Sequence, residues 1–146
     1  MVQNILTFTV KDFAPKFFWR TLKNKLLDID DNAIHTELHH TICRAAEEFY
    51  RLSINIPKAL LEVIQHIHGR FDSALYNVYK AANSLDKETK IKSIRLAKQD
   101  IFFQYTSLEY LVKTHAITVG GANNVLLVLK DAYSQTCKWY SHVLKR

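Results

Sequence analysis

The chain has 146 residues and is 48% hydrophobic, with 20 Lys+Arg against 14 Asp+Glu and a formal net charge of +6. This length corresponds to one domain with a sizeable core, and the apolar and aromatic content excludes a disordered chain. With only 3 Gly and 2 Pro, an all-β fold is excluded as well, because its many turns require such residues.

The two cysteines, Cys43 and Cys137, form neither a disulfide framework nor a C-x-x-C pair. A reducing compartment is therefore the simplest expectation. No apolar run approaches the roughly 20 residues of a membrane span, and no signal peptide is visible. We therefore expect a cytoplasmic protein without a membrane partner.

Residues 1–30 differ from the rest and are predicted to form a short N-terminal extension. An apolar, β-prone run at 5–10 indicates a strand-like segment, and a basic, aromatic helix follows it. We favour a capping helix that packs its apolar side chains on the bundle, and the alternative is a docking arm for a partner, a membrane surface or nucleic acid. The candidate docking residues are Phe17, Phe18, Trp19, Arg20 and Lys23.

Residues 31–146 contain four segments in which apolar residues recur at steps of three and four, the spacing of amphipathic helices. The first runs from residue 32 to 56, with residues 30–32 as candidate N-caps, and it ends before Pro57. The second follows Pro57 and reaches a loop at Asn83-Ser84. Its Gly69 marks either a close helix contact or a mild weakness.

The third predicted helix begins near Lys87 and stops around residues 115–118. The fourth follows Gly120-Gly121, with Thr118 as a candidate N-cap. Its apolar stripe is Ala122, Leu126, Leu129, Tyr133, Thr136, Tyr140 and Val143. Because the loops are short, neighbouring helices are expected to be antiparallel. The predicted fold is thus all-α, an antiparallel up-down four-helix bundle.

Four-helix bundles often hold a metal site between their helices. Di-metal bundles need Glu-x-x-His on two helices, and this chain has one such pair, Glu37 and His40. His35 and His39 are spaced to share a helix face and to grip a metal, but a solvated histidine cluster is the favoured interpretation. No phosphate-binding glycine loop and no cysteine nucleophile with a partner is visible. We predict no metal, no cofactor and no enzyme.

Basic residues concentrate at the start of the third helix: Lys87, Lys90, Lys92, Arg95 and Lys98. Four of them, all but Lys92, fall within about 140° of one another on a helix. Lys98 points close to the core direction of Ile94 and Ile101. Such a stripe is typical of phosphate contacts, and the alternative is a solvated helix start. Since lysine near a helix N-terminus opposes the dipole, stability alone does not explain it.

Several short stretches between residues 32 and 146 resemble a known bacterial family. They are Ile56-Pro57-Lys58, Ala74 to Asn83 followed by Asp86-Lys87, Ile94 to Ala97, Leu108 to Leu111, Ile117-Thr118 and Trp139-Tyr140-Ser141. The family is the four-helix-bundle proteins encoded by intervening sequences of 23S ribosomal RNA, which includes the accessory variability determinant (Avd) of diversity-generating retroelements. The chain departs from it at Cys137-Lys138, where the family often has a Gly pair, and in residues 1–30.

The resemblance implies a non-enzymatic basic protein that forms a homopentameric ring. It also implies binding to a reverse transcriptase and to RNA or RNA/DNA. The residues themselves leave two alternative functions open. One is a protein-interaction bundle without nucleic acid, and the other is a metal or small-ligand bundle that uses His35, Glu37, His39 and His40.

Overall fold

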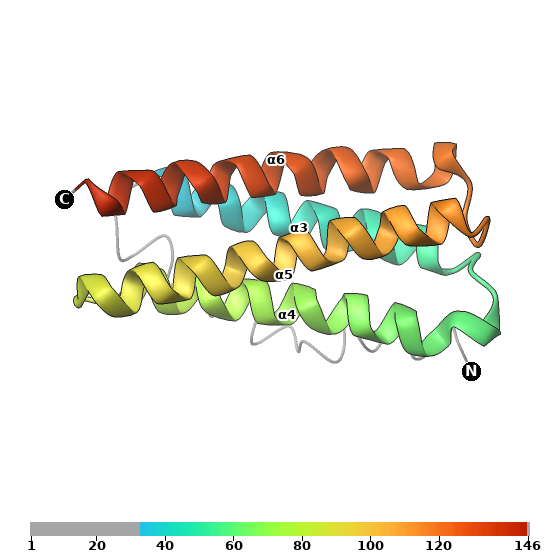
Figure 1. The fold of residues 1–146 in the computed structure, drawn as a ribbon, viewed down its shortest axis with the longest axis horizontal. Helices are drawn as coiled ribbons and strands as arrows, with labels where there is room; N and C mark the ends of the chain where they lie inside the picture. The colour runs from blue at the N-terminus through green and yellow to red at the C-terminus, as the bar shows by residue number, and fades with distance from the viewer. Residues whose placement is uncertain (1–32, 146) are drawn as a thin grey trace.

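The computed structural model describes residues 33–145, which form four long α-helices joined by short loops (Figure 1). The elements are α3 (Ala33–Ser53), the 3-10 turn η2 (Lys58–Leu60), α4 (Leu61–Asn83), α5 (Lys87–Lys113) and α6 (Val119–Leu144). Successive helices run in opposite directions. The predicted all-α, antiparallel up-down four-helix bundle is therefore confirmed, whereas the predicted extension at 1–30 lies outside the described residues.

Each helix packs mainly against two others. The neighbouring pairs are α3–α4, α4–α5, α5–α6 and α3–α6, so α6 closes the bundle beside α3 (Figure 1). Because α5 and α6 are antiparallel, the start of α5 lies beside the end of α6. There the Nζ of Lys87 donates a hydrogen bond of 3.4 Å to the carbonyl oxygen of Leu144. The basic half of α5 thus adjoins the basic end of α6.

Side-chain caps fix the starts of α5 and α6. The Oγ1 of Thr118 accepts a 3.0 Å hydrogen bond from the backbone N–H of Gly121, as predicted for this N-cap. At α5 the cap is Asp86, which accepts from the hydroxyl and the backbone N–H of Thr89. These bonds, with the hydroxyl contributing most, lower the pKa of Asp86. The glycine pair at 120–121, predicted to precede the last helix, lies inside its first turn.

Gly69 and Gly121 are predicted to respond to alanine in opposite ways. A Cβ on Gly69 meets nothing within 4 Å, so this position is a weakness and not a close helix contact. Gly69→Ala should raise the free energy of unfolding by about 0.5–1 kcal/mol. A Cβ on Gly121 would stand 2.9 Å from Thr118 Oγ1 and 3.2 Å from Leu52 Cδ1.

Gly121→Ala should therefore disturb the cap and destabilise the protein by about 1 kcal/mol. Urea unfolding of both variants beside the parent chain measures the two effects. Equal shifts in one direction would contradict this assignment of the two glycines.

The core contains residues of every predicted apolar stripe, but the buried face of α6 differs from the predicted one. Every predicted stripe from α3 to α5 contributes fully buried residues, among them Phe49, Phe71 and Ile101. In α6, however, the largest buried side chain is Trp139, which is 1% exposed and lies off the predicted stripe. Tyr133 and Tyr140, which belong to that stripe, are only partly buried. The inward face of α6 is thus rotated from the predicted one, and the two tyrosines lie toward α5.

Two polar clusters tie helices together inside the bundle. Asp100 of α5 accepts hydrogen bonds from Arg70 Nη1 at 2.9 Å and Ser73 Oγ at 2.7 Å, both on α4. Between α3 and α6, the Nε2 of Gln135 donates to Thr41 Oγ1 at 2.9 Å. Because buried polar groups need such partners, these clusters favour one pairing of the helices over others.

Candidate nucleic-acid interface

Four of the five basic residues predicted to bind nucleic acid reach the surface at the start of α5. The exposed ones are Lys87, Lys92 and Arg95, whereas Lys98 is half-buried. Lys90 is also half-buried, but it stands seven and eleven residues before the buried Ala97 and Ile101, which places it on the inward face of the helix. Lys90 is therefore the least suited of the five to contact a ligand from outside.

Arg95 and Lys98 lie together against two tyrosines of α6. The Nη2 of Arg95 donates a 3.0 Å hydrogen bond to the hydroxyl of Tyr140, and its Cζ lies 5.9 Å from the centre of that ring. The Nζ of Lys98 lies 5.5 Å from the ring centre of Tyr133 and 5.7 Å from that of Tyr140. The quadrupole of an aromatic ring attracts a cation at this range. Lys98 thus lies at the edge of the α5–α6 interface and not in the core.

These four side chains, with Gln99 and Phe102, line a groove of about 390 Å³ between α5 and α6. We call it the cation–aromatic groove. Phe102 is 56% exposed, and its ring centre lies 6.1 Å from that of Tyr133. Tyr133 and Tyr140 are two helical turns apart and therefore face α5 together. The groove combines two positive charges held by aromatic rings with one largely exposed ring.

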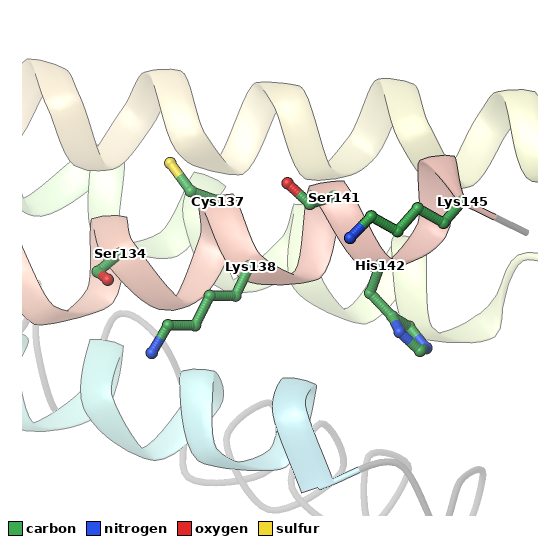
Figure 2. A pocket seen from close by; sticks show the side chains of 6 residues that line it. All are labelled: Ser134, Cys137, Lys138, Ser141, His142 and Lys145. Carbon is green, nitrogen blue, oxygen red and sulfur yellow. The ribbon is translucent and has the colours of Figure 1, made fainter.

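A more open hollow of about 430 Å³ lies on the outer side of α6. It is lined by Ser134, Cys137, Lys138, Ser141, His142 and Lys145 (Figure 2). Figure 2 shows Lys138 and His142 on the side where α3 lies, while Lys145 extends back toward Ser141. None of the lining side chains is buried. Its two lysines make this hollow a second positive surface on α6, separate from the cation–aromatic groove.

The surface at the start of α5 is termed the basic face, and its exposed or half-buried cations are Lys87, Lys92, Arg95 and Lys98. Glu88 is the only acidic residue between positions 87 and 98, and none occurs between 132 and 145. Within the described part of the chain, neither Arg95 nor Lys98 forms an ion pair, and the pairs found there involve Arg44, Arg51 and Arg70. The two charges in the groove are thus available to an anionic ligand.

The histidine cluster does not form the solvated patch that we predicted. His35 and His39 are 1% and 3% exposed, because both point toward the interior of the bundle. The ring of His35 packs 5.5 Å from that of Trp139, and the Nε2 of His39 lies 3.7 Å from the Sγ of Cys43. In residues 33–145, no three His, Cys, Asp or Glu side chains are arranged to hold a metal ion.

The predicted docking residues lie outside the described part of the chain; they are Phe17, Phe18, Trp19, Arg20 and Lys23. Conversely, the structure adds Phe102, Tyr133 and Tyr140, which sequence reasoning had not assigned to a site. Both tyrosines carried a signal, since they stand at helical spacing in the last apolar stripe, but that spacing indicated core residues.

None of the helices described here has both the length and the apolar character that crossing a membrane requires. The chain was compared with family models, curated proteins and solved structures. None of the three gives a match, and its function is therefore inferred from the residues of the basic face.

Proposed function

We propose that this protein is a non-enzymatic accessory protein that binds RNA through the basic face. The observation that carries the proposal is the pair Arg95 and Lys98, held side by side over Tyr133 and Tyr140 at the surface. Neither cation pairs with a carboxylate within residues 33–145. Cations that lack acidic partners and adjoin aromatic rings are typical of surfaces that follow a nucleic-acid backbone.

The position of these cations supports a role beyond stability. Arg95 and Lys98 extend a series of basic residues that begins with Lys87 and Lys90 in the first turn of α5, where the helix dipole favours acidic side chains instead. On α6, Lys138 and Lys145 line a separate positive hollow, in which Lys138 lies on the side of α3 (Figure 2). A surface that concentrates like charges costs stability by mutual repulsion, and a polyanionic ligand relieves it.

The proposal extends to partners through the resemblance to the retroelement family. In that setting the protein forms a homopentamer and binds a reverse transcriptase together with its RNA or RNA/DNA. An outward stripe on α5, with Leu96 and Tyr110 39% and 65% exposed, offers apolar area for such contacts. A solution mass of five chains by light scattering, and co-purification with the reverse transcriptase, are the expected results.

RNA binding is tested by the salt dependence of affinity for a single-stranded RNA. Each phosphate contact contributes about 0.7 to the slope of log affinity against log salt. Arg95→Gln/Lys98→Gln should therefore lower the slope by about 1.4, and Arg95→Glu/Lys98→Glu should abolish RNA retention at moderate salt. Fluorescence anisotropy across a salt series measures both.

The matched control is Lys58→Glu/Lys80→Glu, which makes the same change of net charge at exposed positions on η2 and α4. It should bind RNA nearly as well as the parent chain. The proposal is wrong if the groove variants keep full RNA affinity while their oligomeric state and helicity are intact. Absence of RNA binding by the parent chain would leave the protein-interaction bundle as the better explanation.

A further inference from the structure

We infer that the cation–aromatic groove binds single-stranded nucleic acid, with one unstacked base on the ring of Phe102 and the adjoining phosphate at Arg95 and Lys98. This inference rests on the proposed function, because it specifies which form of nucleic acid the basic face prefers. It follows from which rings in the groove are already covered and which one is not.

The two tyrosines of the groove already have cations over their faces. Lys98 Nζ lies 5.5 Å from the ring centre of Tyr133 and 5.7 Å from that of Tyr140, and Arg95 Cζ lies 5.9 Å from the latter. Within residues 33–145 no cation lies over the ring of Phe102, and this residue is 56% exposed. Of the six residues that line the groove, Phe102 therefore offers the aromatic surface on which a base can stack.

The position of Phe102 is set by its neighbours. Its ring contacts Tyr133 with the centres 6.1 Å apart and the planes inclined at 45°. The preceding residue, Ile101, is completely buried, which anchors this turn of α5 in the core. A ring held in this way loses little conformational entropy when a base stacks on it. Gln99, exposed beside it, supplies an amide that can donate to or accept from a base edge.

The combination of charge and ring distinguishes single strands from duplexes. Positive charges alone attract the backbones of both. A duplex keeps its bases stacked on one another inside the helix, so it has no base face to offer Phe102. Base–aromatic stacking rewards unpaired bases of any sequence. The volume of about 390 Å³ is within the range of sites for small organic groups such as one base.

The experiment compares three ligands with equal numbers of phosphates: a single-stranded oligouridine, an abasic single strand and an RNA duplex. Phe102→Leu keeps an apolar side chain of similar size but removes the ring, and Tyr76→Leu, at an exposed position of α4, is the matched control. Phe102→Leu should weaken binding of the oligouridine by about tenfold. Its affinity for the abasic strand and the duplex, and its salt slope, should be unchanged, and Tyr76→Leu should change none of them.

The outcomes separate this inference from the proposed function. If Phe102→Leu leaves oligouridine binding intact while Arg95→Gln/Lys98→Gln lowers the salt slope, the stacking inference is wrong and the proposed function stands. An equal loss for oligouridine and duplex would also overturn it, because Phe102 would then act only by supporting Tyr133. If the parent chain binds none of the three ligands, both ideas fail.

Discussion

Replacing Arg70 by leucine is expected to lower the free energy of unfolding by about 2–3 kcal/mol. The side chain of Asp100 is only 4% exposed, and the guanidinium of Arg70 lies 2.9 Å from its Oδ1. Removing the cation leaves a buried carboxylate that only Ser73 and Asn77 contact at Oδ2. The expected loss is below that of a fully buried pair because the side chain of Arg70 is 42% exposed.

The matched control is Arg51→Leu, which removes a cation from an exposed pair. The side chains of Arg51 and Glu48 are 70% and 29% exposed at a separation of 3.3 Å. Such pairs contribute at most about 0.5 kcal/mol. Urea unfolding measures both losses, and we expect the dependence of the unfolding free energy on urea concentration to be the same in the variants and the parent chain.

A double variant, Arg70→Leu/Asp100→Leu, should be more stable than Arg70→Leu alone, because no charge is left in the interior. If Arg70→Leu and Arg51→Leu cost the same, the buried carboxylate does not depend on Arg70. The contact would then help to align α4 and α5 without stabilising the fold.

The helices could be predicted because each one carries its own signal, whereas the packing of one helix on another could not. The apolar steps in α4 and α5 located many of the buried apolar residues, from Ile64 to Leu108, because an apolar stripe is a property of a single helix, but they did not locate buried polar residues such as Asp100. In α6 the buried face is rotated from the predicted stripe, because the side that carries Tyr133 and Tyr140 lies along α5 and is only partly buried. A single stripe could not show that Trp139 faces inward while Tyr133 and Tyr140 lie toward α5.

The candidate site was predictable only in part for the same reason. The sequence indicated Arg95 and Lys98 because a run of cations on one helix is visible without a neighbour. Their aromatic partners depend on the pairing of α5 with α6 and on the register between them. The burial of His35 depended on α6 as well, because its ring packs on Trp139, a contact that spacing within α3 does not reveal.

Two titrating groups on α4 should give opposite pH dependences of stability. Burial lowers the pKa of His68 from 6.5 to about 4 and raises that of Asp72 from 3.8 to about 6. The imidazole of His68 is 2% exposed, and its ring packs 4.8 Å from that of Phe49. One turn further along the helix, Asp72 is only partly buried. Each group is thus held closer to its uncharged form than in the unfolded chain.

The sign of each effect follows from which state binds more protons. Between pH 6.5 and 4 the unfolded chain protonates His68 and the folded protein does not, so acidification lowers stability, by up to about 3 kcal/mol over this window. Between pH 6 and 3.8 the folded protein keeps the proton on Asp72 that the unfolded chain has lost. Acidification therefore raises stability through Asp72, by a smaller amount because water reaches this carboxyl.

The contributions of His68 and Asp72 to the pH dependence of stability partly cancel in the parent chain, and substituting each residue in turn should separate them. Asp72→Asn is expected to be more stable than the parent at pH 7, and this advantage should vanish near pH 4. His68→Leu is expected to gain stability relative to the parent as the pH falls from 6.5 to 4. Urea unfolding of the three proteins at each pH measures these differences, in which all other titrating groups cancel.

A constant difference between His68→Leu and the parent at all pH values would mean that the imidazole is protonated equally in both states. That result is incompatible with an imidazole buried against Phe49, for which the described residues provide no hydrogen-bond partner at Nε2. Since a buried imidazolium without a partner would carry the full cost of desolvation, the folded protein must either keep His68 neutral or open this part of the core. The slope of stability against pH therefore reports directly on how tightly α3 closes over α4 at this residue.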